Sequence, residues 1–205
     1  MAEIVIVDYG AGNLRSVINA FRLLGHAPEV SSNPHRIMSA PVVILPGVGA
    51  ASSAMRELHK LNLADALCHR AKQKLPLLGV CLGLQLLMSS TEEGGMISCL
   101  GIVPGVVRKL PESGKIPHMG WNQVGQYHKH RLFDGIENNT NYYFVHSYYV
   151  VPDDNSVAIG RTEYGVDFCS VLVYNSVVAT QFHPEKSDDA GLKFYENFIN
   201  IALGG

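Results

Sequence analysis

The sequence is poor in charge and lacks long apolar runs, and each shortage excludes a class of protein. Only 17% of the 205 residues are charged and the formal net charge is -2, which gives no basic surface for nucleic acid. With 47% hydrophobic residues the chain can build a substantial core, so it is not a disordered protein. No apolar run reaches about 18 residues, and the start MAEIVIVD has no charged region before a cleavage site. We therefore expect no membrane helix and no signal peptide.

Cysteine is also scarce, and its spacing excludes a disulfide framework. The four cysteines, Cys68, Cys81, Cys99 and Cys169, are scattered and form no C-x-x-C pair. This pattern is typical of free thiols in a reducing compartment, so we expect a cytoplasmic protein without a zinc site. We likewise expect no nicotinamide cofactor, because Arg15 stands where a G-x-G-x-x-G fingerprint needs its third glycine.

The first half of the chain alternates between strand and helix patterns. EIVIVD, PVVILPG and the segment 75–80 are short and apolar, which is typical of buried strands. Helical patterns follow at 13–24, at 52–74 and from Leu82 onward. Alternation of this kind predicts a mostly parallel sheet covered by helices on both faces.

From about residue 101 the pattern changes to short strands separated by Pro, Gly, Asn and Asp, which indicates antiparallel or mixed strands added to one side. The chain ends in a helix, 188–203, with Asp188 as its expected cap. We find no linker or repeat, so we expect one α/β domain over residues 1–205.

The segment GVCLGLQ places Cys81 at a predicted strand-to-helix corner, between Gly79 and Gly83. This is the form of a nucleophile elbow, in which glycines permit a sharp turn that exposes the nucleophile. The N–H groups at the start of the helix would stabilise a thiolate, and that of Leu82 would face a developing oxyanion. The alternative, a buried structural cysteine with glycines for close packing, is as strong on this segment alone.

Two further segments also follow predicted strands. In QFHPEKS, His183 and Glu185 are two residues apart, so an extended backbone would direct both side chains the same way, as the base and third member of a triad need. In isolation an ordinary surface loop is the better reading of this segment. LPGVGA, residues 45–50, could present backbone N–H groups to the same edge of the sheet, or be a plain glycine turn. Together the three segments predict acyl transfer through a thioester.

GVCLGLQ with HPEKS far downstream resembles the class I, triad-type, glutamine amidotransferases, which have a flavodoxin-like fold. Within them DYGAGN, LPGVGA, HMGWN, YFVHSYY and QFHPEKS are similar to the glutaminase subunits of imidazole glycerol phosphate synthases, from histidine biosynthesis. The resemblance extends from Asp8 to Ser187. It implies that Cys81 attacks the carboxamide of glutamine, that His183 transfers the proton, and that Glu185 orients His183.

The resemblance implies roles for other residues as well. The oxyanion would be held by N–H groups of Leu82 and of the segment Val48–Gly49, whose glycine predicts that the free chain is nearly inactive until a partner engages. The glutamine pocket would be lined by Gly49, Gln85, Glu93, Ser147 and Tyr148. A (β/α)₈-barrel synthase subunit would form a heterodimer with the chain, receive the ammonia through a tunnel, and face Asn13, Trp121, Tyr143 and Lys186.

Three other readings remain open on the sequence. The chain could be the glutaminase of another synthase, such as that of pyridoxal phosphate biosynthesis. It could be a catalytically silent α/β binding module in which Cys81 is structural. It could also be a cysteine hydrolase that acts on peptides or small amides. The first of these keeps the same triad chemistry, and the other two do not use glutamine.

Overall fold

The computed structural model describes residues 3–10, 13–112 and 114–204. Its centre is a parallel sheet, in which the neighbouring strands are β2 (Glu29–Ser31), β1 (Ile4–Val7), β3 (Val42–Gly47), β4 (Leu77–Cys81) and β13 (Val177–Thr180). Every residue of β1, β3, β4 and β13 is buried, as expected for apolar strands covered on both faces. The predicted parallel core is confirmed.

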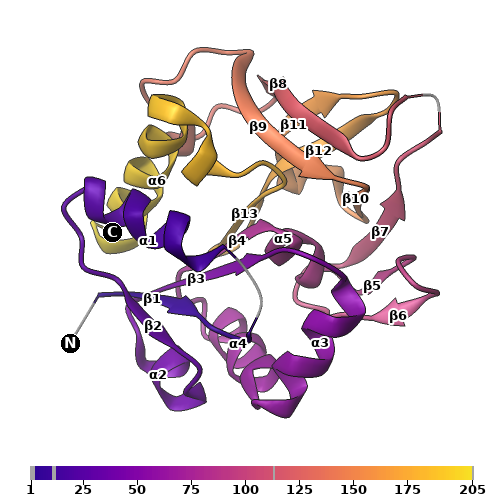
Figure 1. Ribbon diagram of the computed structural model, residues 1–205. Coiled ribbons are helices and arrows are strands. Elements are labelled where there is room, and N and C mark those ends of the chain that lie inside the picture. The colour runs from indigo at the N-terminus through magenta and orange to yellow at the C-terminus, as the bar shows by residue number, and fades with distance from the viewer. Residues whose placement is uncertain (1–2, 11–12, 113, 205) are drawn as a thin grey trace.

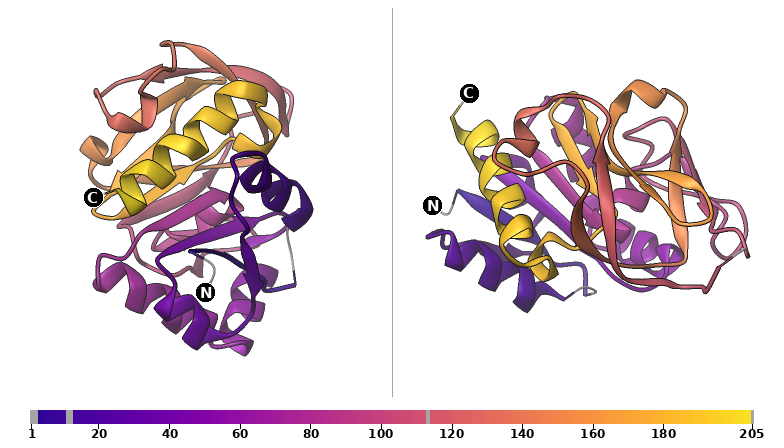
Figure 2. Two further views of the ribbon diagram at one scale, coloured as in Figure 1. Left: turned by 90° about the vertical axis from the view of Figure 1, so that its left-hand side faces the viewer. Right: turned by 90° about the horizontal axis from the view of Figure 1, so that it is seen from above.

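Helices cover the two faces of this sheet (Figure 1, Figure 2). One face carries α1 (Leu14–Leu23) and α6 (Asp188–Leu203), and the other carries α2 (Pro34–Ser39), α3 (Ala51–Lys60), α4 (Leu63–Lys72) and α5 (Leu82–Leu86). Successive side chains of a strand point to opposite faces, so Val5 and Val7 pack with the second group of helices while Ile4 and Ile6 pack with the first. None of the helices in the described part of the chain is long and apolar enough to cross a membrane.

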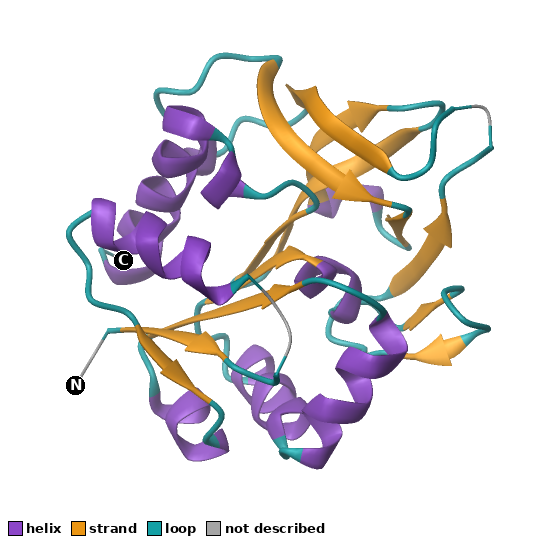
Figure 3. Cartoon of the chain, in the orientation of Figure 1, coloured by secondary structure: helices purple, strands orange, loops and turns teal. Residues whose placement is uncertain are grey.

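The second half of the chain extends the sheet beyond β13 and adds a branch (Figure 3). The extension consists of β12 (Asp167–Tyr174), β10 (Tyr148–Pro152), β7 (Gly105–Lys109), β5 (Ser90–Thr91) and β6 (Ile97–Ser98). The branch leaves from β12 and consists of β11 (Ala158–Glu163), β8 (His118–Gln126) and β9 (Thr140–His146). Short 3₁₀ turns are η1 (Arg131–Phe133), η2 (Asn155–Val157) and η3 (Pro184–Lys186). The predicted antiparallel addition is confirmed.

One strand of the second half joins the parallel core instead. The stretch SVVATQF forms β13, which pairs parallel with β4 and antiparallel with β12. The expectation of antiparallel or mixed strands on one side of the first sheet also holds for β13, which lies beyond β4 with the other strands of the second half. The position of β13 next to β4 matters, because it brings the end of this strand beside Cys81.

Two helix boundaries also differ from the predictions. The pattern over 52–74 is two helices, because Asn62 adopts a left-handed conformation with φ 55° and ends one helix before the next begins at Leu63. The helix after Cys81 is only five residues long, because the carbonyls of Leu86, Leu87 and Met88 accept hydrogen bonds from residues 100–103 instead of continuing it.

At the last helix the capping position is Ser187, not Asp188. Asp188 has φ 48° and stands in the first turn, where its negative charge still favours the helix N-terminus. Helix α2 had no counterpart among the predictions. Its local signals are Pro34 at the first position and an Asn33 side chain that accepts a hydrogen bond from the N–H of His35.

Candidate active site

Three chain segments meet where β3, β4 and β13 end. The three strands are parallel neighbours, so their carboxyl ends lie at one edge of the sheet. Val48 and Gly49 follow β3, Cys81 ends β4, and His183 comes three residues after β13. This meeting point was expected from the sequence, and the topology provides it.

Cys81 occupies a strained backbone conformation at the corner between β4 and α5. Its φ of 54° and ψ of -107° lie outside the regions that non-glycine residues favour. The two flanking glycines make this corner possible. A Cβ on Gly83 would stand 2.0 Å from the Leu45 carbonyl oxygen, and one on Gly79 would stand 3.0 Å from the Gly83 carbonyl oxygen. The elbow predicted from G-x-C-x-G is thus present.

The helix that follows the elbow is short, which limits one part of the expected thiolate stabilisation. A five-residue helix has little macrodipole. What remains is the set of unpaired N–H groups of its first turn, beginning with Leu82, which lines the same cavity as Cys81.

His183 and Glu185 form a buried pair. His183 Nδ1 lies 2.8 Å from Glu185 Oε1, and both side chains are 2% exposed. His183 is extended as predicted, with φ -100° and ψ 98°, whereas Glu185 lies in the 3₁₀ turn η3. The carboxylate therefore reaches the imidazole through a turn rather than along a continuous extended segment. Because Nδ1 is bound to the Glu185 carboxylate, Nε2 is the ring nitrogen that remains for the cavity.

The charges around His183 favour its protonated form. Burial by itself lowers the pKa of His183, but the negative charges of a Cys81 thiolate and of Glu185 outweigh burial and raise this pKa to about 10. His183 Nε2 is buried and has no hydrogen-bond partner among the described residues. An imidazolium with a free N–H beside a thiolate is suited to deliver a proton to a leaving group.

A cavity of about 350 Å³ joins these groups. Its lining includes nine residues that the sequence analysis assigned to catalysis, the oxyanion or substrate: Val48, Gly49, Cys81, Leu82, Gln85, Glu93, Ser147, Tyr148 and His183. Glu185 lies behind His183. Gly49 has a φ of +90°, which only glycine adopts readily, and the loop that carries it is exposed.

Two polar side chains of the lining are held by the backbone. Gln85 Nε2 donates to the Tyr148 carbonyl at 2.9 Å and to Gln181 Oε1 at 3.2 Å. Glu93 Oε2 accepts a hydrogen bond of 2.7 Å from the N–H of Ala51, the first residue of α3. Glu93 therefore also fixes the helix that follows the Val48–Gly49 loop, a contact that the sequence did not reveal.

Sequence reasoning missed several residues of the site. Gln181 Nε2 lies 3.8 Å from Cys81 Sγ, and the Val145 carbonyl oxygen lies 3.9 Å from the same sulfur. The remaining lining residues are Pro117 and His146. A signal was available for Gln181, which stands two residues before His183 and after the same strand.

The residues expected to face a partner divide into a cluster and one separate position. Trp121 is 51% exposed and packs edge-on against Tyr143, with ring centroids 6.2 Å apart. Lys186 Nζ lies 5.6 Å from the centre of the Tyr143 ring, so these three side chains form one patch, next to Glu185 in the chain. Asn13 is exposed at the start of α1, and its side chain donates to Ser16 Oγ at 2.8 Å.

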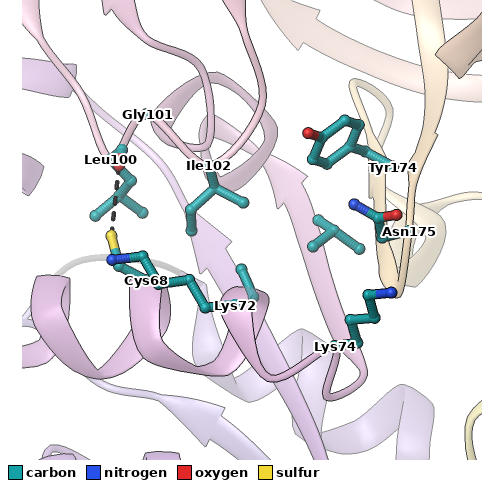
Figure 4. A pocket seen from close by; sticks show the side chains of 10 residues that line it. Cys68, Lys72, Lys74, Leu100, Gly101, Ile102, Tyr174 and Asn175 are labelled. Carbon is teal, nitrogen blue, oxygen red and sulfur yellow. Dashed lines mark hydrogen bonds between the residues drawn. The ribbon is translucent and has the colours of Figure 1, made fainter.

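A second cavity, of about 400 Å³, lies near the opposite ends of the strands and lacks this chemistry (Figure 4). Its cysteine, Cys68, donates its S–H to the Leu100 carbonyl at 3.4 Å, and burial raises the pKa of that thiol. Among the described residues, no histidine or carboxylate lines this cavity, so none of them could act as a base on Cys68 there. In the part of the chain that the structure describes, no three His, Cys, Asp or Glu side chains could together hold a metal ion.

Comparison with known proteins defines the class first. The family model described as "Glutamine amidotransferase class-I" matches residues 5–201. A solved glutamine amidotransferase has a TM-score of 0.77 at 19% identity, covering 97% of this chain and 98% of its own. A glutamine amidotransferase from Thermotoga maritima has a TM-score of 0.64 at 16% identity, covering 97% of this chain and 82% of its own. At these identities the structures show the fold alone.

Curated relatives narrow the class. Proteins named imidazole glycerol phosphate synthase subunit HisH are 51% identical to this chain in Dehalococcoides mccartyi strain CBDB1, over 98% of both chains, and 49% identical in Moorella thermoacetica, over 97% of this chain and 94% of its own. The relative of that name in Methanothermobacter thermautotrophicus is 44% identical over 97% of this chain and 98% of its own. The chain therefore belongs to the HisH family of class I glutamine amidotransferases.

Proposed function

We propose that this chain is the glutaminase subunit of an imidazole glycerol phosphate synthase. The observation that carries the proposal is the cavity in which Cys81, His183 and the predicted glutamine-binding residues meet, in a chain 51% identical to a HisH subunit. The sheet is continuous through both halves of the described chain, which supports one catalytic domain over residues 1–205.

In the proposed reaction the Cys81 thiolate attacks the side-chain carboxamide carbon of glutamine. A carbon–sulfur bond forms, and N–H groups of Leu82 and of the Val48–Gly49 loop hold the oxyanion. The His183 imidazolium gives its proton to the departing nitrogen, so ammonia leaves and a γ-glutamyl thioester remains. His183 then takes a proton from water, whose oxygen attacks the thioester. The carbon–sulfur bond breaks, and glutamate and the thiolate are released.

The partner in this proposal is a (β/α)₈-barrel synthase subunit that forms a heterodimer with this chain. The ammonia would pass into the barrel and yield imidazole glycerol phosphate and an aminoimidazole carboxamide ribotide. The patch of Trp121, Tyr143 and Lys186 supports a docking face beside the triad, because exposed aromatic residues are enriched in interfaces. We place the site of action in the cytoplasm, which agrees with four free thiols.

The decisive test measures glutamine hydrolysis with and without the barrel subunit and its ligand. We expect little hydrolysis by the chain alone, a large increase with the barrel subunit, and complete loss in Cys81→Ala. Cys68→Ala is the matched control and should behave like the unmodified chain. A rate of glutamine hydrolysis that does not change when the barrel subunit is added would favour a glutaminase of another synthase. Hydrolysis of peptides in place of glutamine would favour a cysteine hydrolase.

A labelling experiment separates the catalytic proposal from a silent binding module. A glutamine-like chloroketone should alkylate Cys81 much faster than Cys68 or Cys99, because burial raises the pKa of both of those thiols. Equal labelling of the three cysteines would mean that Cys81 is structural.

A further inference from the structure

Two buried histidines beside the cavity have no part in the proposed reaction. His118 on β8 and His146 at the end of β9 stand directly opposite each other in the antiparallel pair, and they are 3% and 6% exposed. Burial lowers the pKa of His118 to about 4 and that of His146 to about 3. Both rings are therefore neutral near pH 7, and each carries one N–H.

The hydrogen bonds determine which nitrogen of each ring carries the proton. His146 Nδ1 lies 2.9 Å from the Tyr148 carbonyl oxygen, which can only accept, so the proton of His146 is on Nδ1. The lone pair of His146 is then on Nε2, which lies 2.9 Å from His118 Nδ1. His118 must therefore donate from Nδ1 and keep its own lone pair on Nε2.

An amide at the protein surface completes this chain of hydrogen bonds. His118 Nε2 lies 3.3 Å from Asn122 Nδ2. The orientation of this amide is fixed, because its oxygen accepts from the N–H of Gln123 at 2.8 Å and its nitrogen also donates to the Glu163 carbonyl at 3.0 Å. Every donor in the series points the same way, from Asn122 through His118 and His146 to the carbonyl of Tyr148.

The carbonyl that ends the series belongs to the cavity wall. It accepts a second hydrogen bond from Gln85, and the Gln85 amide also contacts Gln181, whose own amide nitrogen lies 3.8 Å from Cys81 Sγ. His146, Ser147 and Tyr148 all line the cavity. The position of this wall thus depends on a donor that His146 supplies, and the His146 ring is held at its other nitrogen by the N–H of His118.

We infer that His118 and His146 are positioning residues of the substrate cavity, which hold the 146–148 segment through a one-directional series of hydrogen bonds that begins at Asn122. The inference rests on the proposed glutaminase function. It assigns the two histidines no contact with the reacting atoms. Their effect is on the shape of the cavity before substrate enters, so their loss should weaken glutamine binding more than it slows the chemical step.

A purely structural role for His118 is the competing explanation, and two substitutions separate the two roles. The His118 ring stacks on Tyr164, with centroids 3.9 Å apart, and on Phe144, with centroids 4.8 Å apart. His118→Phe keeps the stacking and removes the N–H. His118→Asn loses the stacking and keeps an N–H donor near the place of Nδ1. Positioning predicts the defect in His118→Phe and its rescue in His118→Asn, whereas a packing role predicts the reverse.

The kinetic experiment uses the chain with a saturating amount of its synthase subunit. In His118→Phe we expect KM for glutamine to rise roughly tenfold, the loss expected from one buried hydrogen bond, with kcat within about threefold of the unmodified chain. His118→Asn should keep KM within about threefold. His130→Asn is the control, because His130 is a half-buried histidine that does not line the cavity. An unchanged KM in His118→Phe would overturn the inference.

A second measurement does not depend on activity. Long-range ¹H–¹⁵N spectra of the full chain near pH 7 should show the proton on Nδ1 of both His118 and His146. His130 is an internal reference for the opposite tautomer, because its Nδ1 accepts from the N–H of Leu132 at 3.1 Å. A proton on Nε2 of either His118 or His146 would overturn the inference.

Because the spectra report tautomers and not activity, they test the inference independently of the proposed function. If the chain hydrolyses no glutamine even with its synthase subunit, the proposed function fails, while the tautomers still test the hydrogen-bond series. If His118→Phe does not fold, Asn122→Ala removes the first donor from a half-buried position. Asn122→Ala should also raise KM for glutamine, by a smaller factor than expected for His118→Phe. An unchanged KM in Asn122→Ala would count against the inference.

Discussion

The hydroxyl of Tyr195 donates a hydrogen bond of 3.2 Å to Glu185 Oε2, the carboxylate oxygen that His183 does not use. The two oxygens of Glu185 are therefore both occupied, one by the imidazole and one by a phenol from α6. This arrangement fixes the carboxylate and, through it, the ring of His183. Glu185, the third member of the proposed triad, is thus anchored to the C-terminal helix.

Glu185→Gln tests this arrangement. An amide can keep one contact with His183 but cannot stabilise an imidazolium as a carboxylate does, so we expect kcat to fall by roughly a hundredfold or more. Tyr195→Phe removes only the supporting hydrogen bond and should cost less than about tenfold. Both variants would be assayed with the synthase subunit present. A larger loss in Tyr195→Phe than in Glu185→Gln would contradict the assigned order of roles.

Cys81→Ala should lower the pKa of His183. The pKa is raised to about 10 partly because a thiolate at Cys81 favours the charged imidazole. Removing an opposite charge disfavours the imidazolium, so the titration must move to lower pH, by roughly one to three units. The measurement is a pH titration of the His183 ring by NMR, with Cys68→Ala as the control. An unchanged titration in Cys81→Ala would mean that the sulfur and the imidazole do not interact.

Much of the site could be predicted because it lies on short segments next to strands. Cys81 and His183 each stand at or just after an apolar strand, and the carboxyl ends of parallel strands meet at one edge of the sheet. The prediction needed only β3, β4 and β13 to be neighbours. That adjacency brings Cys81, His183 and the Val48–Gly49 loop to one edge of the sheet.

The parts that could not be predicted depend on distant contacts. The series from Asn122 to Tyr148 requires β8 and β9 to pair in one register, and no local pattern specifies that register. Likewise Glu93 binds the N–H of Ala51, which lies 42 residues away in the chain. Helix α5 is short because its carbonyls bond to residues 100–103, a competition that apolar spacing alone does not reveal.

Gly83→Ala should disrupt the elbow. The added methyl carbon would lie 2.0 Å from the Leu45 carbonyl oxygen, which belongs to the buried strand β3 and cannot move freely. We expect a loss of roughly 3 kcal/mol in the free energy of unfolding, at the upper end of overpacking costs, and a large loss of glutaminase activity. Gly114→Ala is the control, since its methyl would make only an ordinary contact with Tyr164 at 3.5 Å. Wild-type stability in Gly83→Ala would contradict the close packing.

Trp121→Ala should weaken binding of the synthase subunit. An exposed tryptophan packed on Tyr143 beside Lys186 has the character of an interface anchor, whose loss typically costs about 2 kcal/mol or about thirtyfold in Kd. Calorimetric titration with the synthase subunit gives the affinity. Tyr127→Ala is the matched control, because Tyr127 is 60% exposed on the segment just after the far end of β8. Equal losses in the two variants would mean that this patch is not the docking face.

Arg70→Met should destabilise the protein without changing the site. The guanidinium of Arg70 is 0% exposed and donates to the carbonyl oxygens of Ile37, Met38, Ala40, Pro41 and Pro76. Burial lowers the pKa of Arg70 to about 10, so the side chain stays charged at neutral pH and its replacement leaves five carbonyl groups short of a donor.

We expect urea unfolding to show a loss of about 3–5 kcal/mol in Arg70→Met, the range for removing one partner of a buried charged network. Arg56→Met is the control, because the Arg56 side chain is 72% exposed and its loss should change stability by less than about 0.5 kcal/mol. The folded fraction of Arg70→Met should keep its kcat, since Arg70 joins α4 to the segments before β3 and β4, away from the cavity at their carboxyl ends. A drop in kcat at full folding would show instead that this buried cation acts on the active site.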